Sequence, residues 1–341
     1  GGGRYMKTAV FAHASTYAQN DASETGGAIY TSGTNINGSF IASSTFDANF
    51  ATLGGGAFYG RNNDVTVEYS TFTGNIAHFG GAHVHKYYGD IYTYASVFAG
   101  GGYDSGCWAD NATVSAGYNF DADGTCSNGA TGDFGAGESP LLQPLANNGG
   151  GTPTRLPETG SPVLDVIDPE TCALDLASVY SPWDQRGVDR RVIVDAGGSC
   201  DIGAVEVVTS VSFTIEGLQG DVDFTVDGAY LHFDACDDVF GIEDAPASAP
   251  AGVTFPHGLI SFCVASGAPG STVTVTVTFP SPVNRAFKVE NSGWQQIPGA
   301  SFDGKTLTYQ VTDGGPLDLD GEADGYIVDP LAAGVGAAFT G

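Results

Sequence analysis

The chain is 341 residues long, enough for two or more domains, and its 51 glycines favour an all-β structure with many turns over a helical enzyme. Only 11 Lys and Arg stand against 39 Asp and Glu, so the formal charge is −28. This charge repels nucleic acids and anionic membrane surfaces, and we expect no nucleic-acid partner. The sequence also has no apolar run long enough to span a membrane.

A unit of about 26 residues recurs through roughly the first hundred positions. One half of the unit is a Gly-Gly-Ala turn followed by a short strand, and the other half is a Ser-Thr-aromatic-x-x-Asn stretch. Self-similarity at this period indicates a solenoid, in which each unit buries its apolar edge against its neighbours. The repeated positions are Gly26, Gly27, Gly55, Gly56, Gly80 and Gly81, then Phe46, Asn49, Phe72, Asn75 and Phe98, with Gly1, Gly2 and Gly3 interpreted as a fourth copy of the glycine half.

The runs between these motifs alternate in polarity, as in residues 64–69 and 90–94, and none keeps a helical period. The sequence therefore predicts a parallel β-helix of about four coils. We expect positive φ angles and close backbone approach at the glycine pairs, stacked aromatic rings inside, and a hydrogen-bonded asparagine ladder. The GGA and FxxN motifs resemble the repeats of the polymorphic outer-membrane protein family over about residues 1–105, and this resemblance implies a right-handed β-helix.

Six cysteines form three pairs of neighbours along the sequence, none of them in a C-x-x-C arrangement. This pattern indicates local disulfides and an oxidising compartment. Six cysteines allow many connectivities, so the pairing of sequence neighbours is a hypothesis. The pairs are Cys107 with Cys126, Cys172 with Cys200, and Cys236 with Cys263.

After Phe98 the repeat fades, and residues 106–206 form a loop-rich region that we call the cap. Its motifs resemble, in order and spacing, the choice-of-anchor Q domain over about residues 96–206. That resemblance implies a region that ends β-helical bacterial surface proteins, ahead of cell-surface anchoring signals. An uncapped β-helix exposes strand edges and apolar core, so we expect the cap to close the solenoid. The motifs are GYN (117–119), DADGTC (121–126), LANNGG (145–150), TPT (152–154), GSPVLD (160–165), DQRG (184–187) and CDIGAVE (200–206).

Within the cap, Arg186 lies in a turn that also carries Asp184 and Asp189, with Asp201 further along the chain. We interpret Arg186 as a structural partner of these carboxylates. The alternative, a catalytic arginine, lacks an accompanying base in the sequence.

From about residue 207 the pattern changes to strands that alternate with period two, at residues 211–215, 271–279 and 307–311. Such alternation predicts a β-sandwich over residues 207–341. Four segments there resemble the choice-of-anchor U domain, which implies a place next to C-terminal sorting signals on exported bacterial proteins. No such signal follows, so we interpret the chain as a processed or truncated export product. The segments are residues 272–280, 293–294, 311–315 and 325–330.

The strongest ligand pattern is an acidic, glycine-rich loop after residue 312. Alternate carboxylates in such a loop suit Ca²⁺, although the spacing is not that of an EF-hand. The alternative is a solvated acidic turn. The predicted ligands are Asp313, Asp318, Asp320, Glu322 and Asp324.

Two further groups of side chains attract attention. His83 and His85, with His78 nearby, form an H-x-H pair that we expect on one face of a strand. Such a pair can hold Zn²⁺ or Cu²⁺. The simpler interpretation is two exposed histidines. Four tyrosines form either a carbohydrate platform or a contact with a covering loop, and we favour the contact. They are Tyr87, Tyr88, Tyr92 and Tyr94.

A catalytic constellation is not evident. The first 105 residues carry only four basic side chains, without clustered acids, and no Ser-His-Asp, Cys-His or phosphate-loop pattern is present. Carboxylate pairs suited to glycoside hydrolysis remain an alternative among so many acids. The basic residues are Arg4, Lys7, Arg61 and Lys86.

The sequence therefore predicts a non-enzymatic, exported bacterial surface protein with a structural or adhesive role. Its N-terminal coil, at Gly1, Gly2 and Gly3, is expected to be open, and an apolar tail from Leu331 to Phe339 of a second copy is a candidate cover. Such a contact is head-to-tail and produces a filament. The alternative is a secreted protein that binds or degrades polysaccharides, with a cell-surface glycan as its partner.

Overall fold

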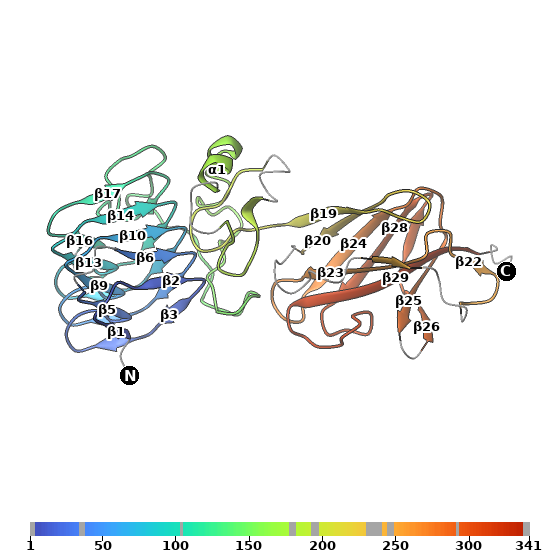
Figure 1. Cartoon of the computed structure of the whole chain (residues 1–341), viewed down its shortest axis with the longest axis horizontal. Helices are drawn as coiled ribbons and strands as arrows, with labels where there is room; N and C mark the ends of the chain where they lie inside the picture. Colours follow the sequence, from blue (N-terminus) through green and yellow to red (C-terminus); the bar gives the residue numbers. More distant parts are fainter. Residues whose placement is uncertain are drawn as a thin grey trace. The chain divides into compact units, whose positions relative to one another are not determined.

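The computed structural model describes residues 4–33, 38–102, 105–176, 182–191, 198–229, 241–243, 249–290 and 293–336. The chain forms two compact units, Gly1–Val207 and Val208–Gly341. The solenoid and the cap together make up the first unit, and the predicted sandwich region makes up the second. Apart from the short helix α1 (Pro169–Leu176), the described elements are β-strands (Figure 1).

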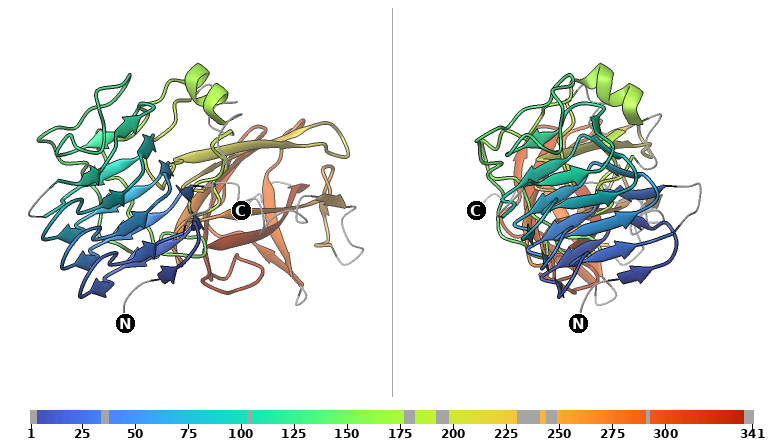
Figure 2. Two further views of the ribbon diagram at one scale, coloured as in Figure 1. Left: turned by 60° about the vertical axis from the view of Figure 1, so that its left-hand side comes forward. Right: turned by 90° about the vertical axis from the view of Figure 1, so that its left-hand side faces the viewer.

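The first unit is a parallel β-solenoid of about four turns, as the sequence predicted. Its strands stack rung upon rung into parallel sheets (Figure 2). The first sheet contains β1 (Arg4–Met6), β5 (Ile29–Thr31), β9 (Phe58–Arg61), β13 (Val84–Tyr87) and β16 (Cys107–Ala109). The second contains β2 (Phe11–His13), β6 (Ser39–Ala42), β10 (Val65–Glu68), β14 (Ile91–Tyr94) and β17 (Thr113–Ser115). The third contains β3 (Thr16–Ala18), β7 (Thr45–Asp47), β11 (Thr71–Thr73), β15 (Val97–Ala99) and β18 (Phe120–Asp121), and the fourth contains β4 (Asp21–Ala22), β8 (Phe50–Ala51) and β12 (Ile76–Ala77).

The repeated aromatic residues stack inside the solenoid. Phe46, Phe72 and Phe98 lie in register in the third sheet, and their ring centroids are 4.6 and 5.3 Å apart. Tyr17 continues the stack at 4.9 Å from Phe46. The 26-residue spacing in the sequence is therefore the length of one coil, and it aligns each ring with its equivalent in the next coil.

The repeated asparagines form the predicted ladder. The side-chain oxygen of Asn49 accepts hydrogen bonds from the backbone N and the Nδ2 of Asn20, at 3.1 and 2.9 Å. The side-chain oxygen of Asn75 accepts the same two bonds from Asn49, at 3.0 and 2.9 Å. Both Asn49 and Asn75 are fully buried, so each amide satisfies the turn of the neighbouring coil without water.

The two glycines of each pair have different tasks. The first glycine of the pair turns the corner with a positive φ, which is 66° at Gly55 and 68° at Gly80. The second allows close approach: a Cβ on Gly56 would overlap the carbonyl oxygens of Ala82 and Ile76. The structure thus confirms both reasons given for the glycines from the sequence.

The cap covers more of the solenoid than the sequence predicted. Residues 118–137 continue the last coil, where Phe120 bridges to Phe134. Residues 107–115 supply β16 and β17 of the first two sheets, and the cap from residue 138 on runs beside the third sheet and buries its outer face. Apolar side chains of that face, such as Val97, form one core cluster with cap residues that include Val163 and Ile202. The cap is therefore a lateral cover as well as an end cover.

The second unit contains two antiparallel sheets, which confirms the predicted β-rich C-terminal region. One sheet has the order β19 (Ser210–Ile215), β20 (Val222–Asp227), β24 (Thr272–Thr278), β28 (Thr306–Thr312), β27 (Ser301–Asp303). The other has the order β21 (Gly241–Glu243), β23 (Leu259–Ala265), β29 (Tyr326–Gly336), β25 (Arg285–Glu290), β26 (Gly293–Gln296), and β22 (Val253–Thr254) also pairs with β29. Inward side chains of both sheets, among them Val275, Tyr309 and Leu331, form one buried core.

This core corrects the expectation for the C-terminal segment. Leu331 is fully buried in β29, where it lies opposite Lys288 of β25. A side chain in this position supports the fold of its own unit and is not available to cover another molecule. The other residues of the predicted assembly contact, Gly1, Gly2, Gly3 and Phe339, lie outside the described residues.

Candidate functional site

Charged side chains are concentrated in the cap, close to its contact with the solenoid. Arg190 is fully buried and pairs with Glu206, which is also buried. The Arg190 guanidinium donates to the carbonyl oxygens of Asp201 and Gly203 at 3.2 and 2.9 Å, and it lies 4.4 Å from the ring centroid of Tyr69 in the solenoid. Arg190 therefore joins cap and solenoid through an ion pair, two hydrogen bonds and a cation–π contact.

Arg186 has the structural role that the sequence suggested. Its guanidinium pairs with Asp184 at 3.0 Å and donates to the carbonyl oxygen of Glu206 at 2.6 Å. Asp184 also accepts the backbone N–H groups of Arg186 and Val188. Of the other carboxylates near it in sequence, Asp189 pairs with Arg191 on the surface, whereas Asp201 is buried.

Two buried carboxyls of this cluster have strongly shifted pKa values. Burial raises the pKa of Glu206 to about 8, against the opposing effect of Arg190. Burial likewise raises the pKa of Asp201 to about 6, although the backbone N–H groups of Val207 and Asp165 favour its charged form. Shifts of this kind accompany active sites, but they also accompany buried ion-pair networks. Here each carboxyl is enclosed and hydrogen-bonded, which is the arrangement of a structural network.

Polar contacts join the cap to successive coils. Gln185 donates to Thr16 of β3 at 2.7 Å and accepts from Thr45 of β7 at 2.6 Å. Arg155 pairs with Asp47 at 2.7 Å, and the backbone N–H of Ala204 donates to Thr71 of β11 at 3.0 Å. The outward polar side chains of the third sheet are thus occupied by the cap.

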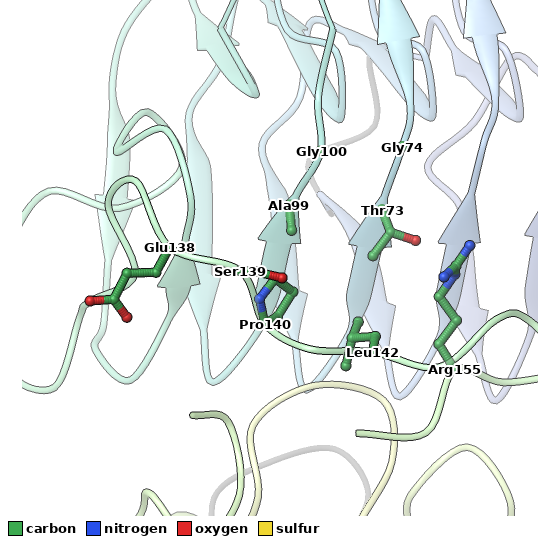
Figure 3. Close-up of a pocket in the computed structure, with 9 residues that line it drawn as sticks. All are labelled: Thr73, Gly74, Ala99, Gly100, Glu138, Ser139, Pro140, Leu142 and Arg155. Atoms are coloured by element: carbon green, nitrogen blue, oxygen red, sulfur yellow. The ribbon is translucent and has the colours of Figure 1, made fainter. Parts of the chain in front are cut away.

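A cavity of about 420 Å³ lies between the third sheet and the cap (Figure 3). Figure 3 shows Arg155 reaching from the cap segment toward the strands, while Glu138 lies at the far end of the cavity. The guanidinium of Arg155 is engaged by Asp47 and by the carbonyl oxygen of Gln143. The lining residues are Thr73, Gly74, Ala99, Gly100, Glu138, Ser139, Pro140, Leu142 and Arg155.

The predicted H-x-H pair is not on one face of a strand. The backbone N–H groups of His83 and Val84 both donate to the carbonyl oxygen of Gly106, at 2.7 and 3.1 Å, so alternation begins only at Val84. His83 is buried, and its Nδ1 lies 3.2 Å from Nδ2 of Asn75. His85 instead packs between Tyr59 and Trp108, with centroid distances of 4.9 and 4.5 Å. The alternative interpretation, in which the two rings share a Zn²⁺ or Cu²⁺ ion, therefore does not fit this arrangement.

Burial also disfavours the charged forms of both rings. It lowers the pKa values of His83 and His85 to about 4 each. The third ring of the group, His78, packs edge-on against Phe50 at 5.3 Å. The expectation of two exposed histidines is therefore wrong for His83, which belongs to the interior.

Lys86 points into the solenoid and not outward. It is 1% exposed, and its Nζ has no hydrogen-bond partner in the described part of the chain. Burial lowers its pKa to about 8, against the attraction of Asp64, Asp110 and Asp90. These acids are brought together at the coil corners: Asp90 belongs to the coil of Lys86, whereas Asp64 and Asp110 belong to the preceding and the following coil.

The four tyrosines do not form one platform. Tyr87 and Tyr88 pack against each other at 4.2 Å, and Tyr92 is exposed. Tyr94 packs edge-on against Tyr69 and Tyr118, at 5.6 and 6.3 Å, beside the core cluster shared with the cap. This arrangement matches the favoured contact interpretation for Tyr94.

A longer aromatic row, which the repeat motifs do not reveal, runs along the outside of the first sheet. Tyr5, Tyr30 and Tyr59 stack at 5.2 and 5.3 Å with nearly parallel rings, and His85 and Trp108 continue the row. All five residues lie in register. Neighbouring rings occupy most of the ring faces, so the row presents mainly ring edges to solvent.

The predicted calcium loop does not assemble its carboxylates around a common point. Asp313 accepts from the backbone N–H groups of Gly270 and Gly325, and Asp318 accepts from those of Gly314 and Val328. Across the described ranges, no three Asp, Glu, His or Cys side chains are grouped so as to hold a metal ion. The loop is organised by carboxylate-to-amide hydrogen bonds. The remaining predicted ligands, Asp320, Glu322 and Asp324, are exposed.

Two disulfides join sequence neighbours, as the predicted pairing requires. Cys107 bonds to Cys126 beside the solenoid core, and Cys172 bonds to Cys200 inside the cap. Cys263 is also disulfide-bonded, whereas Cys236 lies outside the described residues. The two described bonds indicate an oxidising compartment.

The chain was compared with protein families, curated proteins and solved structures. The chain matches no protein-family model, no curated protein and no solved structure. Within the described residues, no helix is both long and apolar enough to cross a membrane.

Proposed function

We propose that this chain is a non-enzymatic extracellular surface protein with a structural role. The observation that carries this proposal is that the outward faces of two solenoid sheets are already occupied by the chain's own side chains. The outer face of the third sheet is covered by the cap, and that of the first sheet carries the self-stacked row from Tyr5 to Trp108. β-Helical enzymes need an exposed acid or base and a partner on such a face.

The pairing of buried charged side chains in the cap supports the same proposal. The buried side chains of Asp184, Arg186, Arg190 and Glu206 are paired with one another or with backbone groups. The disulfides and the hydrogen bond between the fully buried Asn49 and Asn75 add resistance to unfolding. These are properties of a durable scaffold outside the cell.

The repeat and cap motifs give the finer proposal. We infer from their resemblance to polymorphic outer-membrane protein repeats and to the choice-of-anchor Q and U domains that the chain belongs to an exported bacterial surface protein. Head-to-tail self-assembly stays part of this proposal, without Leu331 as a docking residue, since that side chain is buried in its own core.

A glycan array combined with a reducing-sugar assay on acidic and neutral polysaccharides tests the proposal. We expect no bound glycan and no released sugar. Release of reducing ends from any polysaccharide would refute the non-enzymatic assignment. Electron microscopy and light scattering at micromolar concentration test assembly, and a strictly monomeric, non-fibrous sample would remove the filament.

Polysaccharide binding is the second candidate, and the cavity beneath the cap favours it. Its walls combine an arginine, a glutamate, hydroxyl groups and small residues, which is a polar lining that a sugar can use. Glu138→Gln, at the end of the cavity, should abolish any glycan signal that arises there. A signal that survives this change would place binding elsewhere, with the open ring faces of Tyr5 and Trp108 at the ends of the aromatic row as the next positions to examine.

A further inference from the structure

An ion pair lies in the centre of the second unit, away from water. The side chains of Lys288 and Asp329 contact each other through Nζ and Oδ1, and they are 1% and 0% exposed. They come from the neighbouring antiparallel strands β25 and β29. Lys288 lies directly opposite Leu331, so Asp329, two residues earlier on the same face, is its diagonal neighbour.

A third polar group comes from the opposite sheet. Tyr309 of β28 donates its hydroxyl hydrogen to Oδ2 of Asp329 at 2.7 Å, and the Lys288 Nζ lies 5.0 Å from the centroid of its ring. Burial, followed by the adjacent Asp329, raises the pKa of Tyr309 well above its usual value, so the hydroxyl stays protonated. The two oxygens of Asp329 therefore face different partners, an amine at Oδ1 and a hydroxyl donor at Oδ2.

The surroundings of this triad are apolar. Ile327, Leu331 and Val311 are fully or almost fully buried members of the same core. Charges are disfavoured in such a core, and transfer of one proton from the amine to the carboxylate that it contacts converts the ion pair into a neutral amine and a neutral acid. A desolvated neutral lysine is a nucleophile, and a neutral carboxylic acid can accept its attack. A buried ion pair, by contrast, adds little net stability compared with apolar residues of the same volume.

We propose that Lys288 and Asp329 are joined by an intramolecular isopeptide bond. The neutral Nζ attacks Cγ of the protonated Asp329 and forms the N–C bond. A proton moves from Nζ to Oδ1, the Cγ–Oδ1 bond breaks, and Oδ1 leaves as water. The products are one amide and one water molecule, so no oxidant, reductant or co-reactant is needed.

Tyr309 is the catalytic residue of this step. Its hydroxyl donates to Oδ2, which becomes the carbonyl oxygen of the amide, and this hydrogen bond polarises the carboxyl during attack. Once the bond has formed, the same hydroxyl can remain bonded to the amide oxygen. The core would then keep its hydrogen bond while losing two buried charges.

The bond would close a covalent loop through the second unit. Lys288 and Asp329 are 41 residues apart in sequence, and the chain between them contains β26, β27 and β28. A pull on the C-terminal strand β29 would be borne by the side-chain bond between β25 and β29 in addition to their backbone hydrogen bonds. This inference does not depend on the proposed function, although it suits a scaffold under load.

Intact mass spectrometry of the reduced, denatured chain tests the proposal. We expect a mass lower than that of the sequence by one water molecule, and fragmentation spectra of a tryptic digest that join the segment 286–305 to the segment 306–341 through Lys288 and Asp329. Fragmentation is needed because a linear peptide 286–341, left uncut at both Lys288 and Lys305, has the same mass as the cross-linked pair. The full sequence mass for the wild-type chain would overturn the proposal.

Matched variants separate this bond from other losses of water. The chain contains Asp-Gly steps, such as Asp303-Gly304, which can also lose water by forming a cyclic imide. Lys288→Met keeps every Asp-Gly step and should restore the full mass, whereas persistence of the loss in this variant would overturn the proposal. Tyr309→Phe should lower the cross-linked fraction at least tenfold shortly after synthesis. An unchanged fraction would overturn the role given to Tyr309.

Discussion

Replacement of Asn49 by alanine is the sharpest test of the solenoid's internal ladder. The fully buried Asn49 side chain makes four hydrogen bonds: two accepted from Asn20, one donated to the carbonyl oxygen of Tyr17 and one donated to Asn75. A typical buried hydrogen bond contributes about 1 kcal/mol, so the free energy of unfolding should fall by about 4 kcal/mol. Asn75 stays fully buried with one hydrogen bond missing, whereas Asn20 and Tyr17 are only partly buried.

Asn20 provides a matched control in the same ladder. It is partly exposed, and its side chain makes a single bond in the ladder, from Nδ2 to Asn49. Asn20→Ala should therefore lower the free energy of unfolding by only about 1 kcal/mol. Urea unfolding of the disulfide-intact chain, monitored by hydrogen exchange of the solenoid amides, measures the loss of unfolding free energy in both variants. Because only solenoid amides are monitored, unfolding of the second unit does not contribute. Equal losses for the two variants would refute the ladder as a source of stability.

Three further changes address other parts of the structure. The pKa of His83 is about 4 in the folded chain and near its usual value in the unfolded chain, so the stability linked to the neutral ring is present above pH 6.5 and is lost as the pH falls to 4. Between pH 6.5 and pH 4 the free energy of unfolding should therefore fall by about 3 kcal/mol less in His83→Asn than in the wild type. Equal losses in the two proteins, measured by urea unfolding at each pH, would contradict this prediction. Gly56→Ala should destabilise by more than about 3 kcal/mol because its Cβ meets backbone, whereas Gly151→Ala, with open space around it, should be neutral in thermal unfolding. Glu206→Gln should cost about 3 kcal/mol in urea unfolding at pH 9, above the Glu206 pKa of about 8, because it leaves the Arg190 charge buried without its counter-ion; a neutral effect at that pH would show that the pair carries no net charge interaction.

The solenoid was predictable because its signals are local and repeated. One coil buries little by itself, so the same residues must recur wherever the chain returns to the same place, and the equal spacing of Phe46, Phe72 and Phe98 reveals that return. Alternation of apolar side chains identified β24 and β28 for the same reason: period two follows directly from strand geometry.

Errors arose where position depends on long-range pairing. His83 was assigned to a strand face, but the corner at Gly106 delays the alternation by one residue. The pairing of Arg190 with Glu206 brings together two parts of an irregular loop, which no periodicity announces. The acidic loop after residue 312 resembled a cation site in composition, yet the carboxylate direction is decided by nearby backbone N–H groups.

The pair in the sandwich core did leave a signal in the sequence. Lys288 alternates with Ala286 in β25, and Asp329 alternates with Ile327 and Leu331 in β29, so both charges occupy inward positions. A charge at an inward strand position requires a partner. The sequence alone shows that two such charges exist, but only the strand order places them together.

The lateral cover of the solenoid also limits how its length can change. Gln185 holds the coils of Thr16 and Thr45, while Ala204 holds the coil of Thr71 and Gly203 holds that of Ala95. Insertion of one coil between Thr45 and Thr71 would displace the later contacts by about 4.8 Å, the distance between neighbouring strands. The contacts of the cap therefore match one number of coils, and a change in copy number has to be accompanied by a change in the cap.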